Sequence, residues 1–333
     1  MVLPLSILDL APLAHGQTSS QALANSVALA RLAERLGFAR VWYAEHHGMP
    51  GIASTAPDLM IAHVGAHTER IRLGAGGVML PNHAPLRIAE AYRLLEAMHP
   101  GRVDLGLGRA PGTDQRTALA LRGSRELLLR DDFKEQLDEL VGWCEGQPPG
   151  HPLAVVSAQP DDVPLPPVWL LGSSDYSAHL AAERGYPFAF AAHFSPAPPD
   201  GPMLGYRRRF EPGVTKDPYA ILALSVFCAE TTEEAERIAR PTLIAFVRLR
   251  TGRPTRPLSP EAAAAYRFDG IEEQVAAQVR ATQIIGTPEA VTARMRELAT
   301  RTRADEVMVT THASDHAARL RSFELVAAAW RGA

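Results

Sequence analysis

Two kinds of hydrophobic pattern alternate along most of the chain, one typical of strands and one typical of helices. Short apolar runs of strand length are followed by longer segments whose apolar residues recur at helical spacing. The first pair is Leu5–Leu10 followed by Ser20–Leu36, with Gly37 placed to end the helix. The pattern predicts eight strands, at residues 5–10, 41–44, 71–80, 102–107, 168–171, 188–191, 219–228 and 306–310.

Eight strands, each followed by a helical segment, are typical of an α/β fold of the (β/α)8 TIM-barrel type. A doubly wound sheet is the alternative, and it needs a glycine-rich fingerprint after an early strand. None follows the first strand, and in residues 106–112 Pro111 stands where that fingerprint has its third glycine. We therefore predict one barrel domain over residues 1–333, with insertions.

Two segments exceed what a barrel needs. Residues 147–167 are rich in proline and contain one candidate strand at Ala154–Val156. Residues 251–286, between the seventh and eighth predicted strands, form a lid over the rim or a peripheral excursion, and we favour the lid.

Composition excludes several classes of protein. Hydrophobic residues make up 46% of the chain, and the formal net charge of -3 gives no general attraction to nucleic acid or to an anionic membrane. Two cysteines, Cys144 and Cys228, lie far apart without metal-binding spacing. No apolar run is long enough to cross a bilayer, and the first residues do not resemble a signal peptide. We expect a cytoplasmic protein.

In a (β/α)8 barrel the chemistry takes place where the strands end. The second strand ends in Glu45-His46-His47. Adjacent residues of an extended chain point in opposite directions, so at most one of these histidines faces the barrel mouth. A neutral imidazole there would serve as a general acid or base, although a structural role is the alternative. No further ligands are visible at neighbouring strand ends, so we expect no metal.

The next strand ends carry glycine and arginine. Three glycines within Gly74–Gly77 weaken a strand, which indicates either a bulge or a flat ligand close to the backbone. Arg109 lies in a glycine-rich turn after the fourth strand, where its guanidinium suits a phosphate group, and an ordinary surface arginine is the alternative.

The fifth strand leads into the turn Ser173-Ser174-Asp175-Tyr176-Ser177 at the start of a helix. Backbone N–H groups and hydroxyls at a helix start bind anions, although the same serines could simply cap the helix. The fourth and fifth strands are neighbours in a barrel. Arg109 and this turn should therefore converge on one phosphate.

The substrate pocket is less well defined. Residues near strand ends, namely Leu8, Tyr43, His193 and Phe194, would line it and would make it mostly apolar. His193 and His312 follow the sixth and eighth strands and either face this pocket or are structural.

Five motifs in the same order give the chain a resemblance to the luciferase-like monooxygenases, flavin-dependent (β/α)8 enzymes that include bacterial luciferase. They lie at residues 41–47, 76–81, 101–109, 172–185 and 304–310, and they cover nearly the whole chain. The resemblance is greatest to the single-component branch of that family. Where the luciferase subunit has a reactive cysteine, this chain has Gly108, so light emission is not expected.

The resemblance implies a function. It assigns His46 as the acid/base, a non-proline cis peptide at Gly76-Gly77, and phosphate contacts to Arg109 and the serine turn. The enzyme would be a monooxygenase that uses reduced FMN and O2 on a small hydrophobic substrate. A separate NAD(P)H-dependent flavin reductase would be its partner, and the chain would form a homodimer.

Two other functions stay open. A deazaflavin (F420) oxidoreductase of the same fold would transfer hydride without O2. A flavin-binding protein without turnover would need no acid/base, and a histidine at the position of His46 argues against it.

Overall fold

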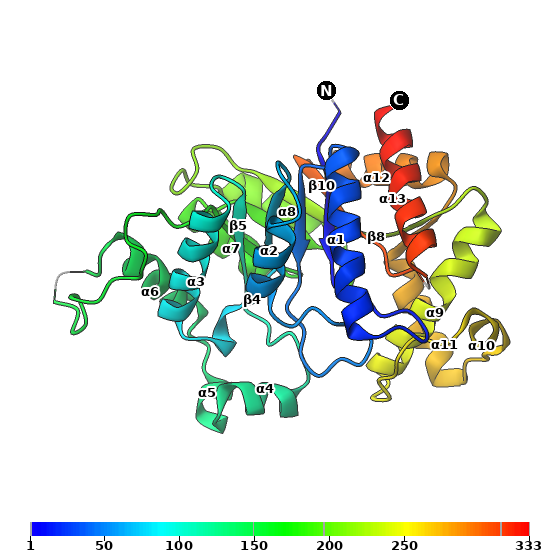
Figure 1. The fold of residues 1–333 in the computed structure, drawn as a ribbon, viewed down its shortest axis with the longest axis horizontal. Coiled ribbons are helices and arrows are strands. Elements are labelled where there is room, and N and C mark those ends of the chain that lie inside the picture. Colours follow the sequence, from blue (N-terminus) through cyan, green and yellow to red (C-terminus); the bar gives the residue numbers. More distant parts are fainter. Residues whose placement is uncertain (1, 149, 196, 314, 333) are drawn as a thin grey trace.

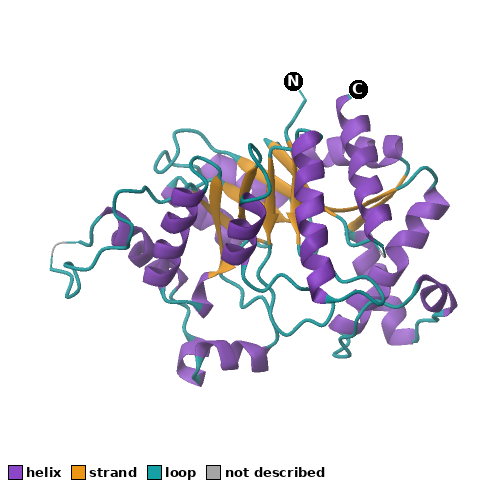
Figure 2. Cartoon of the chain, viewed as in Figure 1, coloured by secondary structure: helices purple, strands orange, loops and turns teal. Residues whose placement is uncertain are grey.

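The computed structural model describes residues 2–148, 150–195, 197–313 and 315–332. Parallel strands form its centre and helices surround them (Figure 2). The strands are β1 (Leu5–Asp9), β2 (Arg40–Tyr43), β3 (Arg72–Ala75), β4 (Val78–Met79), β5 (Val103–Gly108), β6 (Val168–Gly172), β7 (Phe188–Ala191), β8 (Ala220–Cys228), β9 (Gln283–Gly286) and β10 (Glu306–Thr310).

The sheet closes into a barrel because β10 pairs with both β8 and β1. Within the described residues, eight strands form the closed ring β1-β2-β3-β5-β6-β7-β8-β10, and every pairing is parallel. The short β4 pairs with β5, and β9 extends the sheet beside the end of β8. The predicted (β/α)8 fold is confirmed.

Helices follow the strands and cover the outside of the barrel (Figure 1). Where the sequence predicts a helix ending at Gly37, α1 ends with Gly37 at φ 66°, a conformation that favours glycine. The helices are α1 (Ser19–Arg35), α2 (Pro57–Gly65), the 3-10 helix η1 (Leu80–Asn82), α3 (Pro85–Met98), α4 (Gln115–Arg122), α5 (Arg125–Leu129), α6 (Phe133–Glu145), α7 (Asp175–Arg184), α8 (Asp200–Arg209), α9 (Thr232–Arg250), α10 (Pro260–Ala265), α11 (Gly270–Ala281), α12 (Pro288–Thr302) and α13 (His316–Arg331).

Side chains fill the barrel in layers, as strand alternation requires. At the amino-terminal ends of the strands, Arg40 lies between the carboxylates of Asp104 and Glu306. Above it, apolar side chains that include Trp42 and Trp169 form an inner cluster. Residues of opposite parity pack outward against the helices and form a larger cluster. These inner side chains fill the amino-terminal part of the barrel, so a cavity can form only at the carboxyl-terminal ends of the strands.

Two predicted strands are corrected. The third predicted strand is interrupted between β3 and β4 by a cis peptide at Gly76–Gly77. Ala154–Val156 is not a strand: Val155 is 96% exposed, and this proline-flanked segment forms turns because it lies against no strand with which it could pair.

Different segments of the chain lie at the two ends of the barrel. The amino and carboxyl termini lie on one side of the molecule, and α4, α5, α10 and α11 lie toward the other side (Figure 1). The segments after β5 and β8 therefore both extend beyond the carboxyl-terminal rim. Among the described helices, none is long and apolar enough to cross a membrane.

Candidate active site at the carboxyl-terminal rim

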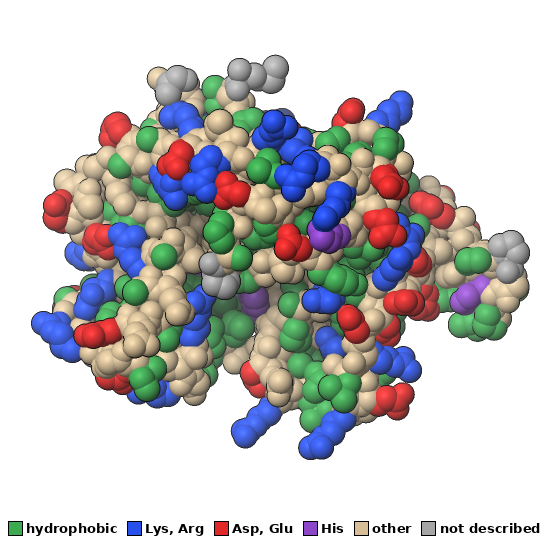
Figure 3. Space-filling model, turned by 180° about the vertical axis from the view of Figure 1, so that it is seen from behind, with side chains coloured by type: hydrophobic (Ala, Val, Ile, Leu, Met, Phe, Trp, Pro, Cys, Tyr) green, Lys and Arg blue, Asp and Glu red, His purple; other side chains and the backbone are tan. Residues whose placement is uncertain are grey.

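A cavity of about 860 Å³ opens at the carboxyl-terminal ends of the strands. It is near the upper end of the range of about 300–1,000 Å³ that is usual for small-molecule sites. The rear face of the molecule is hollowed between two projecting parts, with apolar side chains and a histidine inside the hollow (Figure 3). The cavity is lined by residues of β1, β2, β4, β5, β6, β7, β8 and β10, and also by residues 108–113 and 128–133.

His46 lines this cavity just beyond β2. Its Nδ1 lies 3.0 Å from the carbonyl oxygen of Gly112. A carbonyl only accepts hydrogen bonds, so Nδ1 carries the proton and Nε2 keeps a free lone pair. Burial lowers the pKa of His46 below its ordinary value, more than the Gly112 carbonyl and the Glu45 carboxylate raise it. The ring is therefore neutral at pH 7, with Nε2 able to accept a proton.

His47 has a different role from its neighbour. Its Nε2 lies 2.9 Å from Oε1 of the buried Glu45, and His83 Nε2 lies 2.8 Å from the same oxygen. Burial alone would raise the pKa of Glu45, but the hydrogen bonds from His83, His47 and the Met79 N–H together lower it. The expectation that only one histidine of the pair faces the cavity agrees with this arrangement.

The predicted glycine segment forms part of the cavity wall. The Gly76–Gly77 peptide is cis, and both residues line the cavity. A Cβ on Gly76 would lie 2.7 Å from Leu8 Cδ1 and 3.0 Å from Trp42 Cβ. Protein atoms therefore already exclude a side chain at Gly76. The glycine requirement comes from barrel packing, while the partly exposed Gly76 makes its backbone available to a ligand in the cavity.

Arg109 and the start of α7 lie together, as the adjacency of β5 and β6 predicts. The Arg109 guanidinium stacks 4.0 Å from the ring centroid of Tyr176 and makes a long ion pair, 3.5 Å, with Asp131. Arg109, Ser173, Ser174 and Ser177 all line the cavity. Tyr176 does not, and contributes through Arg109.

Ser174 is the N-cap residue of α7, but its hydroxyl makes no capping hydrogen bond. A serine at this position usually accepts a hydrogen bond from the first turn of the helix. The hydroxyl is therefore available, together with the unpaired N–H groups of the helix start, beside the Arg109 guanidinium. This arrangement suits a phosphate or another anion.

The predicted substrate pocket needs one correction. Leu8, His193 and Phe194 line the cavity, but Tyr43 does not. Tyr43 is fully buried in the outer cluster, between β2 and the helices, because alternate residues of a strand point to opposite faces. Its neighbour Trp42 faces the cavity instead. The sequence did contain the information needed to place Trp42. Side chains alternate along a strand, so Trp42 faces the inside of the barrel together with Arg40 and Ala44, two residues before and after it.

His193 and His312 both have strongly lowered pKa values. Burial, together with the nearby His46, lowers the pKa of His193 to about 3. Burial also lowers the pKa of His312 to about 3, with help from the Arg319 charge. Both rings are neutral at pH 7. His193 lines the large cavity, whereas His312 lines a second pocket.

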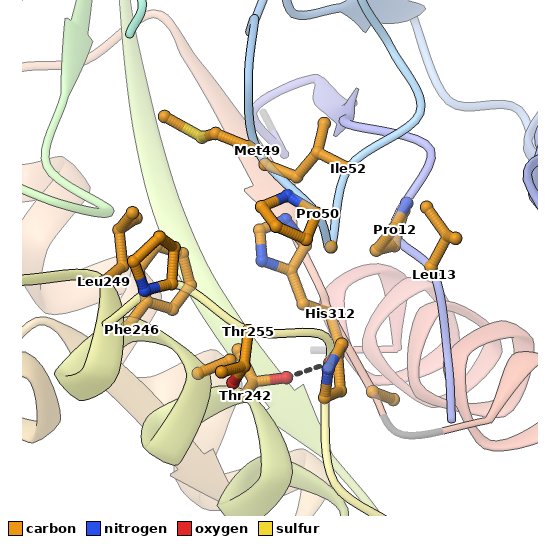
Figure 4. A pocket seen from close by; sticks show the side chains of 15 residues that line it. Pro12, Leu13, Met49, Pro50, Ile52, Thr242, Phe246, Leu249, Thr255 and His312 are labelled. Carbon is orange, nitrogen blue, oxygen red and sulfur yellow. Dashed lines mark hydrogen bonds between the residues drawn. The ribbon is translucent and has the colours of Figure 1, made fainter. Parts of the chain in front are cut away.

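The second pocket, of about 70 Å³, is small and almost entirely apolar. His312 stacks on Phe246 there, with ring centroids 5.9 Å apart, and Thr242 donates a hydrogen bond to the His312 carbonyl. Figure 4 shows how loop segments and α9 meet around it, with Pro12, Leu13, Met49, Pro50, Ile52 and Leu249 among the lining residues.

The insertion that lines the large cavity differs from the one the sequence favours. Residues 110–113 and 128–133, around α4 and α5, form part of the large cavity wall. From the segment 251–286, Pro254, Thr255 and Pro257 line the small pocket. That segment adds β9 to the sheet and packs α10 and α11 on α9. Its position at the rim agrees with the prediction, but the large cavity is covered by the segment after β5.

Several polar side chains of that covering segment also line the cavity and were not predicted, among them Arg122, Arg130, Asp131 and Asp132. Arg122 is the last residue of α4 and follows no predicted strand, so an argument from strand ends could not find it. Within the described chain, no cluster of three His, Cys, Asp or Glu side chains is arranged to hold a metal ion.

Fold and site together define a (β/α)8-barrel protein with a large rim cavity that combines a neutral imidazole, a glycine wall and an anion-binding helix start. The family model of the luciferase-like monooxygenases matches residues 3–306. The chain belongs to this family.

Relatives match over nearly their whole length. A luciferase-like monooxygenase of Escherichia coli strain K12 is 42% identical, covering 96% of this chain and 95% of its own. An N-acetyl-S-alkylcysteine monooxygenase of Bacillus subtilis strain 168 is 34% identical, covering 97% and 96%. The crystal structure of apo-MsnO8 superposes with a TM-score of 0.86 at 34% identity and covers 98% of both chains.

Proposed function

We propose that this protein is an FMN-dependent monooxygenase that uses reduced FMN and O2 to oxidise a small organic substrate. The observation that carries the proposal is the combination, in one cavity, of the His46 imidazole, the Gly76–Gly77 wall and the Arg109–Ser174 anion site. Membership of the luciferase-like monooxygenase family supports the same reaction class.

The residues present fit FMN. The available Ser174 hydroxyl and the Arg109 guanidinium would hold its phosphate, with Ser173 and Ser177 on the same wall. Arg109 is only weakly engaged by Asp131, so a phosphate could replace that carboxylate at little cost. Gly76 and Gly77 bring backbone without side chains to the cavity wall, against which a planar ring can lie. Bound there in reduced form, FMN would supply the electrons that activate O2.

His46 would move the proton in this reaction. The Gly112 carbonyl fixes Nδ1–H, which orients the ring and leaves Nε2 as the proton acceptor. The lowered pKa of His46 keeps that acceptor free at pH 7. Two imidazoles line the cavity, those of His46 and His193, and the assignment to His46 is geometric because the Gly112 carbonyl fixes its acceptor tautomer.

The rest of the cavity would bind the substrate and exclude water. Its lower wall is apolar and includes Leu8, Trp42, Ala223 and Met308. Such a wall favours an apolar substrate body and removes water from the reacting groups. The B. subtilis relative suggests N-acetyl-S-alkylcysteines as the first compounds to test. Because the chain would consume reduced FMN, we expect a separate NAD(P)H-dependent flavin reductase to supply it.

The test is a titration of the purified protein with FMN, reduced FMN and F420, followed by O2 consumption with a flavin reductase. We expect reduced FMN to bind more tightly than F420, and O2 uptake to rise when a substrate is added. Preferred binding of F420, or tight FMN binding without any reaction of the reduced form, would contradict the proposal and favour a hydride-transfer enzyme or a non-catalytic flavin protein, respectively.

A further inference from the structure

Arg122 places a positive charge in the cavity wall without an acidic partner. It is partly buried at the end of α4. Its Nε donates to Asn82 Oδ1 at 3.1 Å, and its Nη1 donates weakly to the carbonyls of Leu127 and Leu128 at 3.4 and 3.3 Å. All three acceptors are neutral. Among the described residues, no carboxylate forms an ion pair with Arg122, and Nη2 makes no hydrogen bond within the protein.

The other two arginines of the cavity wall are paired. Arg109 meets Asp131 at 3.5 Å, and Arg130 meets Glu126 and Asp132 at 3.6 and 3.9 Å. The carboxylates of Asp131 and Asp132, which also line the cavity, pair with these two guanidiniums and not with Arg122. Among the described cavity-lining arginines, Arg122 is therefore the one without a carboxylate partner.

Arg122 lies on the His46 side of the cavity. Asn82, which accepts from Arg122, donates through Nδ2 to the Pro111 carbonyl at 3.0 Å, and the next carbonyl, that of Gly112, holds His46. Arg109 instead contacts Tyr176 of α7, beyond β6. Hydrogen bonds thus connect Arg122 to the loop that holds His46, whereas Arg109 contacts the first turn of α7.

We infer that Arg122 is the substrate's anion-binding residue, and that the substrate is an organic anion, a carboxylate with an apolar body. This inference rests on the proposed function for the identity of the cavity as the substrate site. The apolar body occupies the wall formed by Leu8, Trp42 and Met308, and the carboxylate accepts hydrogen bonds from the free Nη2 of Arg122. A guanidinium already fixed at Nε is well prepared for this role, because less side-chain freedom is lost on binding.

A purely structural role is the competing explanation. Arg122 holds the Leu127 and Leu128 carbonyls and so helps to fix α5 against α4. That role would affect acidic and neutral ligands alike, whereas an anion-binding residue distinguishes between them. The decisive measurement therefore compares two ligands that differ only in charge.

The experiment uses the full-length protein loaded with FMN and measures binding by isothermal titration calorimetry. The two probes are N-acetyl-S-benzyl-L-cysteine and its primary amide. The variants are Arg122→Met, Arg122→Lys and the matched control Arg116→Met, which removes an exposed arginine of the same helix α4 that does not line the cavity. We expect Arg122→Met to weaken binding of the acid about tenfold or more and binding of the amide less than about twofold. Arg122→Lys should have an intermediate effect, and Arg116→Met should bind both probes as the wild type does.

Several results would overturn the inference. One is an equal loss of binding for acid and amide in Arg122→Met. Another is an equal loss of acid binding in Arg116→Met. The third is a wild type that binds the amide as well as the acid, or binds neither. An FMN titration of each variant separates the two proposals. If FMN fails to bind but the charge discrimination persists in the unloaded protein, the function is wrong and the anion site stands; if FMN binds and the discrimination is absent, only the anion site falls.

Discussion

Charged side chains lie inside both ends of this barrel, but their surroundings differ. At the amino-terminal end, Arg40 donates to Asp104 and to both carboxylate oxygens of Glu306, which also accept from Ser6 and Tyr219. At the carboxyl-terminal end, Arg122 has only neutral acceptors, Ser174 does not cap its helix, and His46 keeps one nitrogen free.

The difference shows which polar groups serve stability and which serve binding. A buried charge with all its partners present stabilises the fold only as part of the complete network, and removing one partner is costly. A polar group that lines a cavity with an unused donor or acceptor contributes little to folding, and it remains available to a ligand. Substitutions in the two regions should therefore affect different measurements.

The largest effect is expected inside the barrel. Arg40→Met removes the cation shared by Asp104 and Glu306 and leaves both carboxylates buried. We expect the free energy of unfolding in urea to fall by about 3–5 kcal/mol. The control is Arg70→Met, which removes an exposed ion pair with Glu69 and should cost no more than about 1 kcal/mol. Equal losses in the two variants would remove the contrast between a buried network and a surface pair.

His46→Asn should act on the reaction and not on the fold. The asparagine amide can still donate to the Gly112 carbonyl but has nothing in place of Nε2. We expect reductase-coupled, substrate-dependent O2 consumption to fall about 100-fold or more, with the free energy of unfolding changed by less than about 1 kcal/mol.

The pH profile gives a second measure of His46. Because its pKa is lowered, wild-type activity should hold as the pH falls through 6.5 and decline only below that value. The loss of activity at low pH that comes from protonation of His46 should be absent from the residual activity of His46→Asn. An unchanged rate, or the same acid decline in the variant, would remove His46 from the reaction.

The buried histidines of the rim should make stability depend on pH. His193 and His312 have pKa values of about 3 in the folded protein against 6.5 ordinarily, so below pH 6.5 the unfolded chain binds protons that the folded chain does not. Stability is complete above pH 6.5 and falls with decreasing pH, by up to about 1.4 kcal/mol per pH unit for each group. Urea unfolding of His312→Asn from about pH 7.5 to about pH 5 should show a slope reduced by about one proton. A slope equal to that of the wild type would contradict the assignment.

The smallest effect is expected at the helix start. Ser174→Ala should leave stability unchanged, because the hydroxyl does not cap α7, and should weaken FMN binding by about fivefold, the value of one hydrogen bond. Ser259→Ala provides the reverse case: Ser259 caps α10 by accepting from the Ala262 N–H. It should cost about 1 kcal/mol of stability and leave FMN binding unchanged. Thermal unfolding and FMN titration of both variants test the pair.

Much of the site could be predicted because barrels place chemistry at strand ends. His46, Arg109 and the Ser173–Ser177 turn follow predicted strands directly, so their positions on the rim followed from the order of the strands. Tyr43 was misplaced because its side of the strand depends on parity, and a single shift by one residue exchanges the inner and outer faces. Trp42 was missed for the same reason.

Two long segments show where such reasoning ends. Residues 110–132, which were not predicted to be an insertion, and residues 251–286, which were, both leave the rim. Their composition does not tell which one turns over the barrel mouth. The first does, bringing Arg122 to Asn82, a residue 40 positions earlier. The second adds β9 to the sheet beside β8. Loops of this length are positioned by packing against distant residues, which local sequence patterns do not record.

The sequence by itself determined the closed parallel barrel and the polar residues at its strand ends, because hydrophobic periodicity and strand order are local properties of the chain. Only the tertiary structure decided that His46 keeps Nε2 free, that Ser174 leaves its helix uncapped, and that Arg122 enters the cavity without a carboxylate. Each of these depends on which partner from elsewhere in the chain reaches a given atom, and that is settled by packing between segments.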